Sequence, residues 1–240
     1  MTDEIKRLSE LLKNENISCV PDFEDRLLKF TEFFLETAKT LNLTAIKEPH
    51  EVMIKHYFDS LYPLKFNYIK ENARVADIGC GGGFPSIPIK LARPDVYMLQ
   101  LDSLRKRLAF LENAHSLLNL SGIETVHARA EEAGRKKEFR DSFDAAVSRA
   151  VAPLNLLCEL CMPFVRPGGV FLAYKGAPDS SETDAALPAI SKLSGEIEDI
   201  IHYELPENMG ERTLIVIRKL KPTHPMYPRT TKSMSKKPII

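Results

Sequence analysis

The sequence has no run of about 20 apolar residues and no positively charged, then apolar, leader at its N-terminus. The first absence argues against a membrane-spanning chain, and the second against an exported one. Hydrophobic residues make up 44 % and charged residues 28 % of the 240 residues, which are ordinary values for a globular protein. We therefore expect a soluble, cytoplasmic protein, and we expect it to be a monomer.

Cysteine is scarce, and its spacing does not complete a metal site. The four cysteines suit a reducing compartment better than a disulfide framework. Cys158 and Cys161 form a Cys-x-x-Cys pair, but no second pair exists to make a zinc site. We interpret the pair as small apolar residues on one helix face, and we expect no metal.

Acidic residues are absent from one end of the chain. Residues 212–240 contain eight Lys and Arg and no Asp or Glu, although the net charge of the whole chain is zero. Residues 1–60, in contrast, hold twelve acidic residues against eight basic ones. This distribution predicts an anionic partner at the C-terminal end, with a merely solvated tail as the alternative.

The hydrophobic pattern divides the chain into three parts. Residues 1–65 carry apolar residues at helical spacing and predict an N-terminal helical extension or cap. Within it, His56 and Asp59 would share a helix face, as an acid–base pair or, as we favour, in structural contacts. Residues 66–220 form the predicted main domain. Residues 221–240, rich in Pro, Ser, Thr and Lys, predict a basic tail that we expect to be mobile.

The main domain alternates strands with helices, which is typical of a parallel sheet covered on both faces. We expect parallel strands at residues 74–78, 96–101, 123–128, 143–148 and 169–174, and a closing antiparallel pair at 197–203 and 212–218. One intervening helix should bury a stripe formed by Leu104, Leu108, Leu111 and Leu118. The fold class is thus α/β with a mostly parallel, seven-stranded sheet.

A glycine-rich loop follows the first expected strand. The strand ends in Asp77, and Gly79, Gly81 and Gly83 follow with G-x-G-x-G spacing. Glycines allow positive φ and let a ligand lie against the backbone. Alone, this pattern is weak evidence and also fits a tight strand-to-helix turn.

Polar residues at the ends of the next strands favour a nucleoside site. Asp102 ends the second strand, where a carboxylate can accept hydrogen bonds from ribose hydroxyls, and Glu131 and Arg149 follow the third and fourth. A dinucleotide normally needs G-x-G-x-x-G spacing. The acidic Asp77 instead suits a cationic cofactor such as S-adenosylmethionine, with NAD as the alternative.

A resemblance to a known family extends this prediction over nearly the whole chain. The chain closely resembles the bacterial RsmG family, also called glucose-inhibited division protein B (GidB), in the following segments, in order: Asn42-Leu-Thr-Ala45, His56-Tyr-Phe-Asp-Ser-Leu61, Asp77-Ile-Gly-Cys-Gly-Gly-Gly-Phe-Pro85, Arg129-Ala-Glu131, Ser148-Arg-Ala150, Lys175-Gly176 and Tyr227-Pro-Arg229. The resemblance implies a Rossmann-like, S-adenosylmethionine-dependent methyltransferase acting on N7 of a specific guanine, in the 530-loop region of 16S ribosomal RNA in the small ribosomal subunit.

The resemblance also implies roles for individual residues. It places the methionine part of the cofactor against Gly79 and Phe84, the ribose against Asp102 and Ser103, and the adenine by Ala130 and Glu131. Arg149 would border the methyl-transfer site.

Methyl transfer to N7 of guanine does not require removal of a proton, because N7 carries a lone pair and no proton. Transfer therefore needs positioning rather than an obligatory general base. The sequence also lacks the Asn/Asp-Pro-Pro-aromatic box of exocyclic-amine methyltransferases, since Ser148-Arg-Ala150 stands there. We hypothesise that Arg149 orients the guanine through O6 or a phosphate.

Basic residues complete the predicted substrate site. Lys175, Arg212 and Arg229 are candidates for contact with the RNA backbone. Two other functions stay open at this point: a methyltransferase acting on a small molecule, and an RNA-binding or assembly factor that holds the cofactor structurally.

Overall fold

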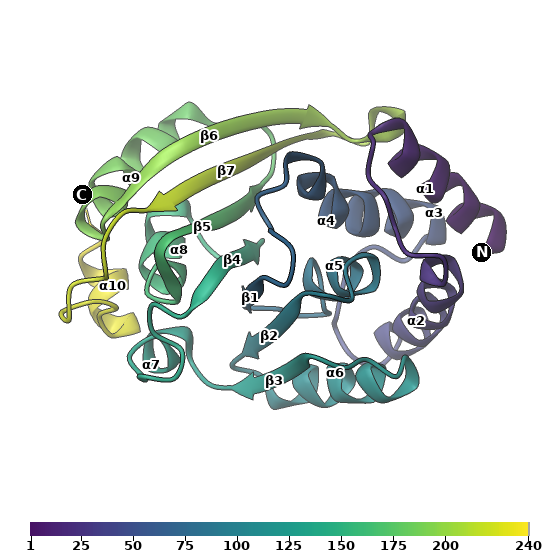
Figure 1. The fold of residues 1–240 in the computed structure, drawn as a ribbon, viewed down its shortest axis with the longest axis horizontal. Helices are drawn as coiled ribbons and strands as arrows, with labels where there is room; N and C mark the ends of the chain where they lie inside the picture. Colours follow the sequence, from purple (N-terminus) through teal and green to yellow (C-terminus); the bar gives the residue numbers. More distant parts are fainter. Residues whose placement is uncertain (240) are drawn as a thin grey trace.

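A seven-stranded sheet runs through the computed structural model, which describes residues 1–239 (Figure 1). The order of its strands is β3-β2-β1-β4-β5-β7-β6. The parallel strands are β1 (Arg74–Ile78), β2 (Tyr97–Asp102), β3 (Ile123–His127), β4 (Phe143–Arg149) and β5 (Val165–Lys175). β7 (Glu211–Lys219) pairs antiparallel with both β5 and β6 (Gly195–Glu204). The expected α/β fold is confirmed.

The sheet is covered on both faces because its central strands are apolar on both sides. Ala76, Leu99 and Phe171 face the core beneath α8 (Leu154–Cys161) and α9 (Ser180–Lys192). Their sequence neighbours Val75 and Met98 face the opposite core, which α5 (Ser86–Ala92) and α6 (Arg105–Leu117) cover. Figure 1 shows α1–α6 on one side of the sheet and α7–α10 on the other.

The N-terminal helices share the core of the sheet. They are α1 (Thr2–Asn14), α2 (Phe23–Ala38), α3 (Pro49–Val52), the π-helix η1 (Met53–Phe58), α4 (Asp59–Leu61) and the 3₁₀-helix η2 (Tyr62–Phe66). Phe30 and Phe34 of α2 lie with their ring centroids 5.9 and 5.1 Å from that of Phe84, which follows the glycine loop. These helices therefore fix the position of the loop.

Two details differ from the sequence-based expectation. β5 starts before the Arg166–Gly169 turn, and its pairing with β4 shifts register there. Leu104, expected in a buried stripe, is 50 % exposed because it precedes the first turn of α6, whereas Leu108, Leu111 and Leu118 are buried.

The C-terminal segment packs against the body of the protein, where we expected a mobile tail. It contains α10 (Thr231–Lys236), and Met234 and Ile239 are buried. The reason is chemical: Arg229 pairs with the buried carboxylate of Glu159 on α8, with 2.6 Å between Nη2 and Oε2. Two short helices complete the fold, α7 (Ala130–Ala133) and η3 (Pro206–Asn208). Within residues 1–239 no helix is long and apolar enough to cross a membrane.

Candidate active site

A cavity of about 560 Å³ lies at the carboxyl ends of β1, β2 and β4, where the strand order reverses. Ligands of open α/β sheets bind at this kind of reversal. Eight of the predicted site residues line the cavity: Gly79, Gly81, Phe84, Asp102, Ser103, Ala130, Glu131 and Arg149. They come from the ends of four different strands, so the fold brings together residues as far as 70 positions apart.

The glycine loop presents its backbone to this cavity. Gly79 has φ +77°, and a Cβ atom there would lie 2.6 Å from Cγ2 of Val151. Glycine alone combines this conformation with so close an approach. The N–H groups of Gly79 and Cys80 donate to the carbonyl oxygen of Leu101 at 2.8 and 3.1 Å, which ties the loop to β2.

Asp102 joins the end of β2 to the glycine loop. Its buried carboxylate accepts hydrogen bonds from the N–H of Gly81 at 3.0 Å and the N–H of Leu104 at 2.8 Å. Arg107 lies 3.5 Å away on α6. An ionised carboxylate has about four acceptor positions, so Asp102 can still accept from the hydroxyl groups of a ligand.

The far end of the cavity is formed by α7 and α10. Ala130 and Glu131 begin α7, and Thr231 and Met234 of α10 line the cavity with them. The Thr231 hydroxyl donates a hydrogen bond to the Glu131 carboxylate. Sequence reasoning missed Thr231 and Met234, because α10 contains a single apolar residue and therefore has no hydrophobic period.

Arg149 is held at the other end by groups of the N-terminal helices. Its Nη1 lies 2.9 Å from Oδ2 of Asp59 and also donates to the carbonyl oxygens of Lys55 and His56, both at 3.3 Å. The guanidinium lies over the Phe84 ring, 5.4 Å from its centroid. The π-helical turn η1 presents these two carbonyl groups, and π-helical turns are frequent at functional sites.

His56 and Asp59, which sequence reasoning placed on one helix face, both bind Arg149 rather than each other. Nδ1 of His56 accepts from Arg149 at 3.2 Å, and Nε2 donates to the hydroxyl of Thr44 at 2.8 Å. Burial and the positive Arg149 lower the pKa of His56 to about 3. The imidazole is therefore neutral at physiological pH, and both of its nitrogens have partners.

Two predicted site residues, Asp77 and Gly83, do not line the cavity. Asp77 is fully buried; its Oδ2 accepts from the N–H of Ser86 at 3.3 Å, and Oδ1 has no partner among the described residues. Burial raises the pKa of Asp77 to about 7, although the hydrogen bonds from Ser86 act in the opposite direction. From this position Asp77 supports the start of α5, and its direct contact with a ligand stays a prediction.

A second cavity, of about 390 Å³, adjoins the first and shares His56, Arg149 and Ala150 with it. Two of the predicted RNA contacts line it, Lys175 and Arg212. Lys175 also pairs with Glu182 at 2.6 Å, and Arg212 lies 3.6 Å from Asp59.

The third predicted RNA contact, Arg229, lies elsewhere, because its guanidinium binds Glu159. Within residues 1–239 no three His, Cys, Asp or Glu side chains gather as a metal site requires.

Comparison with known sequences identifies relatives over most of the chain. Residues 24–213 match the family model described as GidB, rRNA small subunit methyltransferase G. A protein of Alkaliphilus oremlandii named ribosomal RNA small subunit methyltransferase G is 41 % identical over 232 residues, which cover 97 % of each chain. A protein of Staphylococcus epidermidis with the same name is 39 % identical over 236 residues, which cover 98 % of each chain.

Solved structures show a similar fold at low sequence identity. A SAM-dependent methyltransferase of Methanosarcina mazei matches with a TM-score of 0.52 at 17 % identity, over 67 % of this chain and 99 % of that one. A SAM-dependent O-methyltransferase of Thermotoga maritima matches with a TM-score of 0.51 at 14 % identity, over 80 % of this chain and 73 % of that one. These likenesses concern the fold alone.

Proposed function

Because this chain belongs to the GidB family of rRNA small subunit methyltransferases G, we propose that it transfers a methyl group from S-adenosylmethionine to N7 of a guanine in 16S ribosomal RNA. A ribosomal substrate implies activity in the cytoplasm, where we expect the protein to act as a monomer. The proposal rests on the position of Arg149. This cation is held by Asp59 on the boundary between two adjoining cavities.

The first cavity suits S-adenosylmethionine in its chemistry. The buried Asp102 carboxylate beside the glycine loop can accept hydrogen bonds from ribose hydroxyl groups, as an acidic residue at this position also does in NAD sites. Membership of a methyltransferase family supports S-adenosylmethionine over NAD. Gly79, Gly81 and Phe84 would hold the methionine part, Asp102 and Ser103 the ribose, and Ala130 and Glu131 the adenine. When bound, the cofactor supplies an electrophilic methyl group on a sulfonium ion.

The second cavity suits the target nucleotide. Lys175 and Arg212 line it beside Arg149, and basic side chains attract the phosphates of RNA. We propose that the guanine enters here, with Lys175 and Arg212 near its phosphates.

Arg149 orients the guanine in this proposal. Asp59 and the carbonyl groups of η1 fix Arg149 in place. Its guanidinium has five N–H donors, so donors remain for guanine O6 or a phosphate. N7 carries a lone pair and no proton, and His56 is neutral with both nitrogens engaged. These features favour rate enhancement by positioning and by exclusion of water, without a general base.

Methyl transfer from labelled S-adenosylmethionine to 16S RNA, free or in the small subunit, tests the function. We expect label at guanine N7, detected as strand cleavage after borohydride and aniline treatment. A wild-type protein that labels neither substrate, or labels another atom, would refute the proposal. Label on a small molecule instead would favour the alternative enzyme class, and cofactor binding without any transfer would favour an assembly factor.

Substitution of Arg149 tests its role separately. We expect Arg149→Ala to lower kcat by about 100-fold at saturating RNA and cofactor, the scale seen when one stabilising donor is removed. The matched control is Arg166→Ala, because Arg166 is exposed and pairs with Asp144 outside both cavities. An unchanged kcat for Arg149→Ala removes Arg149 from the site.

A further inference from the structure

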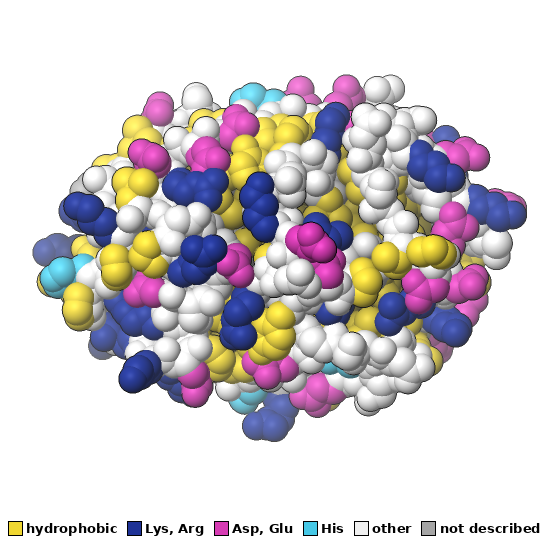
Figure 2. All heavy atoms as spheres, viewed as in Figure 1, with side chains coloured by type: hydrophobic (Ala, Val, Ile, Leu, Met, Phe, Trp, Pro, Cys, Tyr) yellow, Lys and Arg dark blue, Asp and Glu magenta, His cyan; other side chains and the backbone are white. Residues whose placement is uncertain are grey.

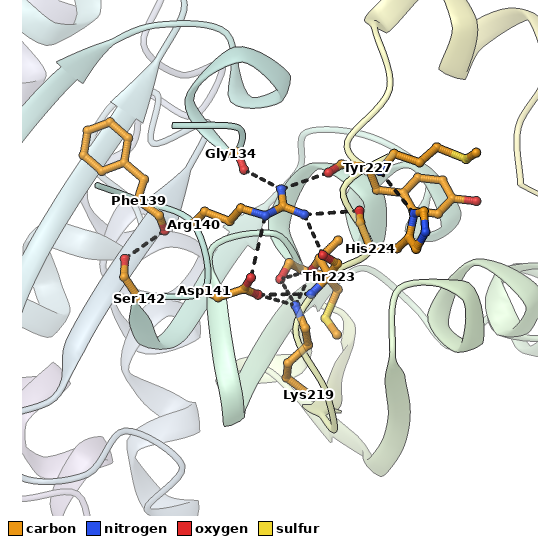
Figure 3. A network of polar contacts seen from close by, with 11 residues as sticks. Gly134, Phe139, Arg140, Asp141, Ser142, Lys219, Thr223, His224 and Tyr227 are labelled. Atoms are coloured by element: carbon orange, nitrogen blue, oxygen red, sulfur yellow. Dashed lines mark hydrogen bonds and ion pairs between the residues drawn. The ribbon is translucent and has the colours of Figure 1, made fainter. Parts of the chain in front are cut away.

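We call residues 221–239, which follow β7, the C-terminal strap. Polar contacts of three basic side chains hold this segment against the rest of the protein. The first anchor is Lys219, whose fully buried ammonium group donates to the carbonyl oxygen of Met162 at 2.6 Å, to the hydroxyl of Thr223, and to Asp141 at 3.2 Å. This contact ties the start of the strap to the loop before β4 and the end of α8 (Figure 3).

The second anchor is Arg140, which binds the backbone of the strap. Its guanidinium donates to the carbonyl oxygens of Thr223 at 2.7 Å, His224 at 3.2 Å and Tyr227 at 2.9 Å, as Figure 3 shows. It also donates to the carbonyl oxygen of Gly134, just after α7, at 3.0 Å. One side chain therefore joins the strap to the helix that carries Ala130 and Glu131.

The third anchor is the ion pair of Arg229 and Glu159. Both carboxylate oxygens of Glu159 accept from the guanidinium, Oε1 from Nε at 2.8 Å and Oε2 from Nη2 at 2.6 Å, and Oε1 also accepts from the backbone N–H of Arg229 at 2.7 Å. Glu159 is only 1 % exposed. A carboxylate buried to this degree is costly unless it is paired, so the strap belongs to the folded protein.

The anchored strap reaches the first cavity. After Arg229 the chain enters α10, whose Met234 is 1 % exposed and lines the cavity together with Thr231. The two side chains lie at the end where Ala130 and Glu131 begin α7, and the Thr231 hydroxyl donates to the Glu131 carboxylate. The other four side chains of α10 are exposed: Lys232, Ser233, Ser235 and Lys236.

We propose that the strap supplies two residues to the cofactor site: Met234 as an apolar wall for the adenine ring, and Thr231 as the positioning residue of Glu131. The inference rests on the proposed use of S-adenosylmethionine. A flexible thioether side chain fits an apolar ring surface, and a hydroxyl donor fixes the orientation of a carboxylate that faces a ligand.

Equilibrium binding of S-adenosylmethionine and S-adenosylhomocysteine tests this inference without RNA. We expect Met234→Ala to raise Kd about tenfold for both, the scale for removal of one apolar group from a pocket. We expect Thr231→Val to raise Kd about threefold to tenfold, and Thr231→Ser to restore it, because the contribution of one hydrogen bond is of this order. The control is Lys232→Ala, an exposed neighbour on the same helix, which should leave Kd unchanged.

The outcomes separate the inference from the proposed function. Wild-type Kd values for Met234→Ala and Thr231→Val would overturn the inference alone, whereas a wild-type protein that binds neither ligand would overturn the proposed cofactor. Met234→Leu keeps the side-chain volume and should bind within about twofold of wild type. An equal rise in Kd for Met234→Leu and Met234→Ala, with a lowered melting temperature of the free protein, would attribute the effect to misfolding and overturn the inference.

Discussion

Gly79 and Gly83 of the loop after β1 have different tasks, although both have positive φ. Gly79 lets the chain pass close to Val151 at the cavity. Gly83 lies outside the cavity with φ +89°, and a Cβ atom there would lie 2.7 Å from Cγ1 of Ile87 and 2.8 Å from Cδ2 of Leu111. Gly83 is thus a packing glycine that lets α5 and α6 approach the loop.

Gly83→Ala should therefore lower stability more than Gly81→Ala does. The new methyl group meets two buried side chains, and overpacking of this kind costs about 1–3 kcal/mol in addition to the strain of positive φ. At Gly81, with φ +55°, an added methyl group would have its nearest neighbouring atom 3.9 Å away, so substitution there adds strain alone. Urea unfolding measures both, and equal decreases in stability for the two variants would contradict this account.

At the residue scale, sequence reasoning identified most residues that line the first cavity. It could not predict whether the side chain at the end of a strand points into the cavity or away from it. Asp102, Glu131 and Arg149 follow parallel strands, and the ends of parallel strands meet at one edge. Asp77 follows the same rule, yet it does not line the cavity, and Ser86 binds its side chain. The direction of a side chain at the end of a strand depends on the path of the loop, which the spacing of glycines does not specify.

At the element scale, the N-terminal helices are fastened to the antiparallel edge of the sheet by His50. Its Nδ1 lies 2.7 Å from Oε2 of Glu4 on α1, and its Nε2 lies 2.6 Å from Oε2 of Glu207 in η3. Arg7 of α1 also binds Glu207, at 2.6 Å. The hydrogen bonds to Glu4 and Glu207 raise the pKa of His50 above its ordinary 6.5.

This ion-pair cluster predicts a pH-dependent stability. A histidine with a raised folded-state pKa stabilises the protein fully below 6.5, and the contribution disappears as the pH rises through the folded-state value. Melting temperatures of wild type and His50→Gln should thus differ at pH 5.5 and converge by pH 8.5. Comparing the two proteins removes the effect of other titrating groups, and a difference that is constant with pH would refute the prediction.

Helices and strands with a regular hydrophobic pattern could be predicted from the sequence, and those without such a pattern could not. β1 spans the predicted residues, and β2, β3 and β4 each lie within one residue of the predicted range at either end. α10 has a single buried residue, Met234, so no period marks it as a helix that packs. Its position depends on Arg229 and Glu159, which lie 70 residues apart, and no local pattern reports such a pair.

At the scale of the whole molecule, the net charge is zero, so attraction of RNA depends on local groups of basic residues and not on the overall charge. Figure 2 shows acidic and basic side chains interspersed over one face. Several basic residues near the C-terminus are already paired, among them Arg218 with Glu198 and Arg229 with Glu159. Three of the exposed lysines of the strap, Lys232, Lys236 and Lys237, are better placed for phosphates.

Salt dependence tests whether these lysines bind phosphates. Replacing Lys232, Lys236 and Lys237 by Ala should weaken binding of 16S RNA and reduce the slope of log K against log salt by about 1 for each phosphate that is no longer neutralised. Deleting the strap would be less informative, because Met234 and Thr231 would leave the cofactor cavity with it. Cofactor binding by the triple variant serves as the control, and an unchanged slope would exclude these lysines as partners of the RNA.

The π-helical turn η1 has a consequence for how this protein can change in evolution. An α-helix rotates about 100° with each residue, so deleting Tyr57 or Phe58, which lie between His56 and Asp59, would turn these two side chains out of alignment with each other. Arg149 would then lose either its carboxylate or its imidazole partner. We therefore expect insertions or deletions between His56 and Asp59 to be selected against more strongly than substitutions of the residues in this turn that do not contact Arg149.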